Sequence, residues 1–72
     1  MVYNLIQMKI KIWEVRSSKG ITLVSLSEMT GISKSALNNI ENGKVSPKLD
    51  QMEQIAIALK CRITELFESD HK

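Results

Sequence analysis

Residues 22–43, TLVSLSEMTGISKSALNNIENG, decide the fold, because they contain two short helical patterns joined by a tight turn. Thr22 and Ser33 stand where a helix needs a hydroxyl to accept a free backbone N–H. Gly31 permits the left-handed backbone that a sharp turn between helices requires. The predicted elements are a helix over 22–29, a turn at 30–33 and a helix over 34–41.

The second of these helices is predicted to have one polar face. At 100° per residue, its polar side chains fall within an arc of about 140°. These side chains are Lys34, Ser35, Asn38, Asn39 and Asn42. Amide and ammonium groups can pair with base edges and phosphates, and a helix of about 12 Å matches the width of the DNA major groove. Surface helices are often polar as well, so this face alone leaves a merely solvated helix open.

Length and composition indicate one small globular domain: 72 residues, 43% hydrophobic and 25% charged. Cys61 is the only cysteine, which excludes an internal disulfide or a thiolate metal cluster, and we expect it to be a small core residue. No apolar run reaches the ~18 residues of a membrane span, and the N-terminus lacks a secretory pattern. We therefore expect a soluble cytoplasmic protein with no membrane partner.

The net charge of +2 is unevenly distributed along the chain. Residues 1–48 contain seven Lys or Arg and three Glu, a balance of +4, whereas residues 49–72 contain three basic and five acidic residues, a balance of −2. The basic part coincides with the two-helix segment, a distribution that a phosphate backbone would attract. A randomly mixed surface explains the charge alone equally well.

The remaining periodicity predicts three more helices, over 6–19, around 49–59 and over 63–68. The alternation over residues 8–12 is also compatible with a strand, but the next residues break that period and a lone strand would have no partner. We therefore expect an all-α, five-helix chain that forms one domain over residues 1–72. Residues 1–6 would be an N-terminal arm and residues 69–72 a frayed tail.

An ordered set of residues at fixed spacings resembles the Cro and phage-repressor-like, or XRE-type, helix-turn-helix family over nearly the whole chain. The residues that carry the resemblance are Arg16, 19–21, Leu26, 31–33, Leu37, 40–44, Ser46, Pro47, Leu49, Ile55, Ala56, Ala58, Leu59 and 65–67. The resemblance implies a compact lambda-repressor-like domain with the helix-turn-helix at its second and third helices. It also implies binding to duplex DNA as a dimer.

Individual roles follow by position from this resemblance. The residues implied to contact bases or adjacent phosphates are Ser33, Lys34, Ser35 and Asn39. Asn38 is added to them because it lies on the same face. The implied contacts to the DNA backbone are Asn42 and Lys44, together with Lys48. The resemblance also implies a structural ion pair between Arg16 and Glu41, which would orient the third helix.

Four positions depart from the family pattern. Leu23 replaces a common glutamine that would bind a phosphate, and Thr30 replaces an aliphatic core residue. Lys60 stands in place of a glycine after the fourth helix, and Arg62 in place of a capping serine. These departures predict weaker phosphate contact at the start of the second helix and fraying of the last helix.

Several apolar residues occupy positions that the family normally exposes: Val2, Tyr3, Leu5, Ile10, Trp13, Val24 and Met29. Either the N-terminal arm folds back over them, or they form a protein interface, as in a homodimer. The segment Leu66–Phe67 is a second candidate for that interface. The sequence does not rank the two.

No cluster of residues indicates an enzyme, a metal site or a cofactor. The single histidine, His71, lies near the C-terminus and has no expected function. The leading hypothesis is a dimeric repressor bound to a partly palindromic operator with half-sites ~34 Å apart. The alternatives are an antitoxin that represses its own operon and masks a toxin, or a protein-interaction module that retains the fold and binds a separate protein.

Overall fold

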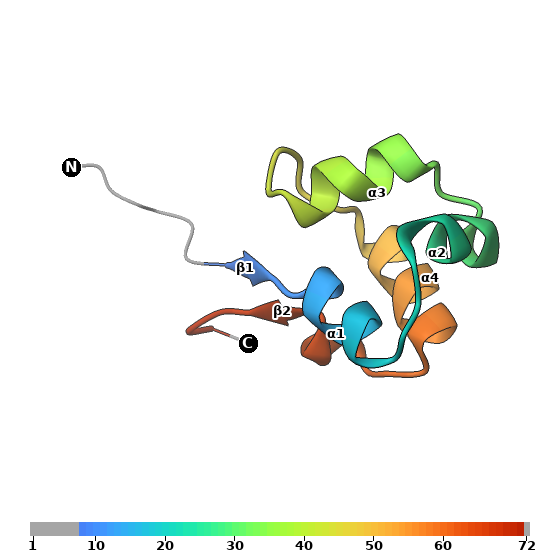
Figure 1. Ribbon diagram of the computed structural model, residues 1–72. Helices are drawn as coiled ribbons and strands as arrows, with labels where there is room; N and C mark the ends of the chain where they lie inside the picture. The colour runs from blue at the N-terminus through green and yellow to red at the C-terminus, as the bar shows by residue number, and fades with distance from the viewer. Residues whose placement is uncertain (1–7, 72) are drawn as a thin grey trace.

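The computed structural model describes residues 8–71 and contains four α-helices around one core (Figure 1). The helices are α1 (Ile12–Ser18), α2 (Leu23–Thr30), α3 (Lys34–Glu41) and α4 (Leu49–Leu59). A 3₁₀ turn, η1 (Ile63–Glu65), and two short strands, β1 (Lys9–Ile10) and β2 (Phe67–Glu68), complete the described part. The predicted residues Val2, Tyr3 and Leu5, the predicted arm over 1–6 and Lys72 lie outside the described residues.

Each helix contributes apolar side chains to the core at the spacing that a one-sided helix requires. The buried residues are Ile12, Leu26, Leu37, Ile40, Met52, Ile55, Ala56, Leu59 and Leu66. Helix α2 packs against both α3 and α4, so it connects the third helix to the fourth. No helix in the described residues is both long and apolar enough to cross a membrane.

The predicted helix over 6–19 is wrong in its first half. Lys9 and Ile10 are in β1, which pairs antiparallel with Phe67 and Glu68 of β2, and helix α1 begins only at Ile12. A strand at this position has no partner in the neighbouring sequence, and the structure supplies one from the other end of the chain. Local periodicity could not reveal a pairing between segments more than fifty residues apart.

The predicted fifth helix is also wrong, so the described residues form a mostly helical fold with four α-helices and one short strand pair. Residues 63–65 form a single 3₁₀ turn, after which the chain extends as β2. At the start of this turn, the backbone N–H of Arg62 donates to Glu65 Oε2 at 2.9 Å. The side chain of Glu65 thus supplies the cap that Arg62 lacks, and pairing with β1 replaces a further helical turn.

The caps predicted around the central segment are confirmed. The hydroxyl of Thr22 accepts from the backbone N–H of Ser25 at 3.0 Å, and that of Ser33 accepts from Ala36 at 3.1 Å. Gly31 ends α2 with φ = 75°. Lys60 ends α4 in the left-handed region with φ = 55°, the conformation that glycine would adopt at lower cost.

Candidate nucleic-acid interface

Three residues connect α2 to α3, and two hydroxyl groups fix this turn at Ile32. The hydroxyl of Ser27 donates to the Ile32 carbonyl oxygen at 2.6 Å. Thr30 Oγ1 accepts from the Ile32 N–H at 3.1 Å and donates to the Leu26 carbonyl at 2.8 Å. Both backbone polar groups of Ile32 are therefore satisfied from α2, which fixes the angle at which α3 leaves the turn.

These bonds explain why Thr30 can stand in place of an aliphatic residue. They also predict that an aliphatic side chain at this position would lower stability. A Thr30→Val variant should lose about 1 kcal/mol of unfolding free energy, because the Ile32 N–H loses its acceptor. Thr30→Ser keeps the hydroxyl and serves as the control. Urea unfolding followed by circular dichroism measures both variants; a Thr30→Val protein at least as stable as the wild type would contradict this role.

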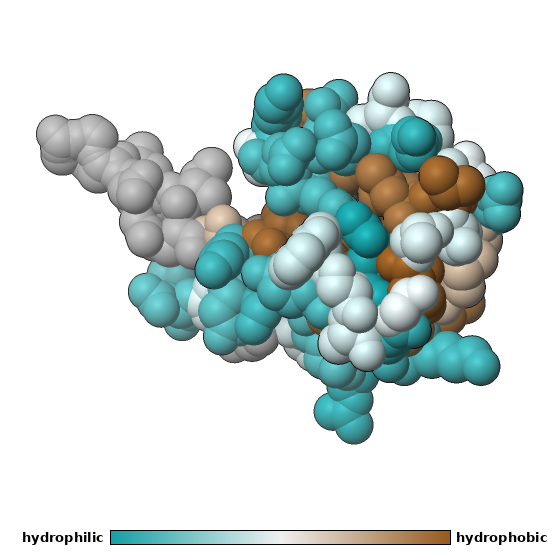
Figure 2. Space-filling model, in the orientation of Figure 1, coloured by the Kyte–Doolittle hydropathy of each residue, from teal (hydrophilic) through white to brown (hydrophobic). Residues whose placement is uncertain are grey.

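Helix α3 presents hydrophilic side chains outward over its length (Figure 2). Lys34, Ser35 and Asn38 are exposed, whereas Asn39 is half-buried. Leu37 and Ile40 are buried on the opposite side, so the helix is anchored by one face and offers the other to solvent. The structure thus brings the four predicted base-contact positions of α3 onto one short helix.

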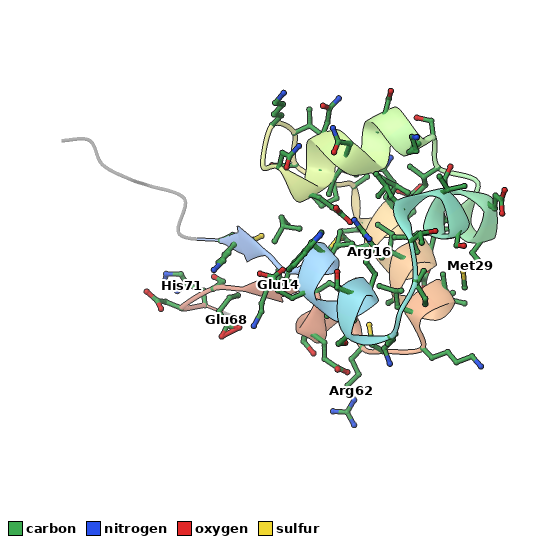
Figure 3. All side chains as sticks on the ribbon, in the orientation of Figure 1. Glu14, Arg16, Met29, Arg62, Glu68 and His71 are labelled. Atoms are coloured by element: carbon green, nitrogen blue, oxygen red, sulfur yellow. The ribbon has the colours of Figure 1, made fainter. Side chains whose placement is uncertain are left out.

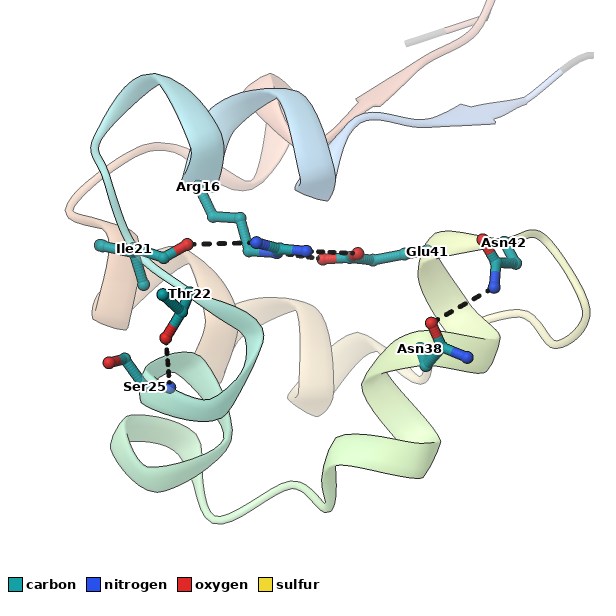
Figure 4. Close-up of polar contacts among 7 residues, drawn as sticks. All are labelled: Arg16, Ile21, Thr22, Ser25, Asn38, Glu41 and Asn42. Atoms are coloured by element: carbon teal, nitrogen blue, oxygen red, sulfur yellow. Dashed lines mark hydrogen bonds and ion pairs between the residues drawn. The ribbon is translucent and has the colours of Figure 1, made fainter.

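Three of the other predicted contact residues, Ser33, Asn42 and Lys44, lie at or just beyond the ends of this helix. Ser33 caps it, and Asn42 follows its last turn, where Asn42 Nδ2 donates to Asn38 Oδ1 at 3.3 Å (Figure 4). Lys44 is exposed in the following loop, and its backbone N–H donates to the Asn39 carbonyl at 2.9 Å. Lys48 is separate from this group, at the start of α4.

Arg16 connects α1 to the end of α3 (Figures 3 and 4). Its Nε and Nη2 donate to Glu41 Oε2 and Oε1 at 2.6 and 3.0 Å, and Nη1 donates to the Ile21 carbonyl at 3.2 Å. The two side chains are only 13% and 6% exposed. The hydrogen bonds to Glu41 raise the pKa of Arg16 above its ordinary value. This geometry is bidentate, so the pair fixes the orientation as well as the distance of the two helices.

Residues 14–66 match the helix-turn-helix family HTH_3. The chain belongs to this family. Its structure is similar to the crystal structure of an HTH_3 family transcriptional regulator from Vibrio cholerae, with a TM-score of 0.71 and 31% identity over 75% of this chain. The chain matches 30% of that regulator's length. Comparison with curated proteins finds no match.

In this HTH_3 chain, Leu23, which departs from the family pattern, contributes to the packing of α2. Its side chain is half-buried and packs against the core at the first residue of α2. A leucine there contributes to the apolar contact between helices and offers no hydrogen bond to a phosphate.

Elsewhere in the described residues, the side chains that could bind a metal or act as a nucleophile are dispersed. Over residues 8–71, no three His, Cys, Asp or Glu side chains come together as a metal site. His71 and Glu68 lie at the β-ribbon end of the molecule (Figure 3). Cys61 is half-buried against the core, and this burial, with Glu65 nearby, raises the pKa of its thiol. A raised thiol pKa keeps the sulfur protonated and unreactive.

The sequence interpretation missed two features of this region. One is the Ser27 hydroxyl, which reaches the turn from the previous helix; its only sequence signal was a polar residue beside the turn. The other is a hollow of about 460 Å³ between β1, the first turn of α1 and the end of α3. One of its walls is β1, a segment for which the sequence predicts helix.

Proposed function

We propose that this chain is a sequence-specific regulator of transcription that binds duplex DNA through α2 and α3, as a dimeric repressor in the cytoplasm. The observation that carries the proposal is the exposed polar face of α3 on a helix fixed at both ends. The Ile32 bonds hold its start, and the Arg16–Glu41 pair holds its end. Family membership and the fold shared with the Vibrio cholerae transcriptional regulator support it.

In this proposal α3 lies in the major groove. Lys34, Ser35, Asn38 and Asn39 contact base edges, for which amide and ammonium groups have the required donors and acceptors. Ser33, Asn42, Lys44 and Lys48 hold the phosphate backbone. A dimer would place two such helices on half-sites about 34 Å apart, which makes the operator partly palindromic.

Selection of bound fragments from random duplex DNA, followed by gel-shift titration, tests this function. Asn39→Ala should change the preferred sequence, because a base contact is lost. Lys44→Ala should weaken binding to every sequence and lower the salt slope by about one, because a phosphate contact is lost. Lys19→Ala, an exposed lysine at the end of α1, is the charge-matched control and should leave the salt slope unchanged.

Two results would overturn the proposal. If no duplex is retarded even at low salt, the polar face of α3 is a solvated surface. If Asn39→Ala and Lys44→Ala reduce binding equally on selected and random DNA, Asn39 does not read bases.

A further inference from the structure

Two amide side chains at the end of α3 form a hydrogen bond across one helical turn. Asn42 Nδ2 donates to Asn38 Oδ1 at 3.3 Å, and Figure 4 shows the Asn38 oxygen directed at the Asn42 nitrogen. Residues four apart are neighbours on one side of a helix, so both amides belong to the polar face of α3. Asn38 is exposed on that face and is one of the proposed base contacts. The bond therefore decides which atom of the Asn38 amide a base edge would meet.

The backbone of Asn42 is fixed, although its side chain is exposed. Its N–H donates to the Asn38 carbonyl oxygen at 3.0 Å, and the N–H of Gly43 donates to the Ile40 carbonyl oxygen at 3.1 Å. Gly43 permits this tight path because its φ of 74° lies in the left-handed region, which glycine adopts without steric cost. The Asn42 side chain thus extends from a fixed point beside the last turn of α3.

Electrostatics favours a donor, rather than an acceptor, directed from Asn42 towards α3. The last turn of a helix carries the negative end of the helix dipole, which attracts an N–H and repels an oxygen. The carboxylate of Glu41 is directed elsewhere, because both of its oxygens accept from Arg16 of α1. The oxygen of Asn38 is then the acceptor, and no acceptor within residues 8–71 is bound to its Nδ2. The Asn38 amide consequently offers a hydrogen-bond donor to solvent.

The four bases differ in the DNA major groove in a way that a fixed donor distinguishes. Guanine O6 and thymine O4 are acceptors, whereas adenine and cytosine carry an amino group at the corresponding positions. A donor held against the base edge therefore favours guanine or thymine, and an acceptor held there favours adenine or cytosine. An asparagine free to rotate its amide can present either group, so the orientation of the amide sets the preference.

We propose that Asn42 is a positioning residue that turns Asn38 Nδ2 towards the base edge, so that Asn38 selects guanine or thymine at one position of the operator. This inference rests on the proposed function, because it specifies the base chemistry of one of its contacts. The second N–H of the Asn42 amide remains available for the phosphate contact proposed above. One side chain would then connect the hold on the DNA backbone to the choice of base.

An aspartate at position 42 tests this role, because at neutral pH a carboxylate accepts hydrogen bonds and donates none. Asn42→Asp should reverse the Asn38 amide, so that Nδ2 donates to the new carboxylate and the oxygen meets the base. In selection from random duplex DNA, the wild type should favour guanine or thymine at one position by about fivefold. Asn42→Asp should favour adenine or cytosine at that same position, and Asn42→Ala should favour neither pair.

Two further variants assign the effect to the contact between the two amides. Asn38→Ala should abolish the preference at that position, and adding Asn42→Asp to it should change nothing further there. Lys44→Ala is the matched control, because it removes a proposed phosphate contact from the same loop. It should weaken binding to every sequence and leave the preference for guanine or thymine unchanged. If both Asn42 variants do the same as Lys44→Ala, Asn42 holds a phosphate only, and the inference is overturned.

Nuclear magnetic resonance of the free protein separates this inference from the proposed function. One Nδ2 proton of Asn42 should be shifted downfield in the wild type, and Asn38→Ala should remove that shift. In Asn42→Asp the downfield shift should appear at Asn38 Nδ2 instead. Asn42 resonances unchanged by Asn38→Ala would overturn the contact whether or not DNA binds. A wild type that binds no duplex would overturn the proposed function and the base preference with it, while the spectra still decide whether Asn42 positions Asn38.

Discussion

An Arg16→Ala variant is expected to lose most of its folded population. Glu41 is 6% exposed, and without Arg16 its carboxylate would be left without its guanidinium partner. Removing one partner of a buried pair costs about 3–5 kcal/mol, and a domain of this size has stability on the order of 5 kcal/mol. The Ile21 carbonyl would lose its bond to Arg16 as well. Urea unfolding followed by circular dichroism should show this loss directly.

Two further variants separate the charge from the geometry of this pair. Arg16→Lys keeps the charge but loses the bidentate contact. Its unfolding free energy should lie between those of the wild type and Arg16→Ala. A double variant, Arg16→Met with Glu41→Leu, removes both charges and should be more stable than Arg16→Ala alone. A loss under about 1 kcal/mol in Arg16→Ala would show that the pair does not hold α3.

A Leu37→Ala variant is expected to lose about 3–5 kcal/mol of unfolding free energy, the range for a buried leucine whose cavity does not collapse. Leu37 is fully buried and is one of two buried residues that anchor α3, the other being Ile40. The loss should therefore loosen the helix that carries the proposed contacts. Thermal and urea unfolding measure the effect, and an unchanged urea midpoint would contradict it.

The neighbouring residue provides the matched control for Leu37. Asn38 is exposed on the opposite side of the same helix, so Asn38→Ala should change stability by less than about 0.5 kcal/mol. In the proposed function the same variant weakens DNA binding. Leu37→Ala tests the anchored face and Asn38→Ala the exposed face of one eight-residue helix.

The central segment could be predicted from local chemistry because its signals are local. Thr22 and Ser33 cap helices through residues three positions later, and Gly31 adopts the left-handed backbone at the expected turn. The same local reasoning failed at both ends of the chain. There the alternation of residues 8–12 and the apolar pattern of residues 63–68 are each compatible with two structures.

The candidate interface likewise has features that the local sequence predicts and features that depend on tertiary structure. The polar face of α3 follows from residue spacing, because a helix fixes which side chains share a side. The role of Thr30 could not be read from the sequence, because its acceptor bond depends on the path of the turn. The exposure of the apolar residues could not be read from the sequence either: Leu66 is fully buried, whereas Trp13 is 57% exposed.

The sequence by itself determined the α2–α3 unit, its caps and the polar face of α3, because these depend on contacts within a few residues. Tertiary structure alone decided that β1 pairs with β2, that the last segment is not a helix, and which apolar side chains remain exposed. The physical reason is that strand pairing and burial depend on partners distant in the sequence, and their gain exceeds the small local preference for helix.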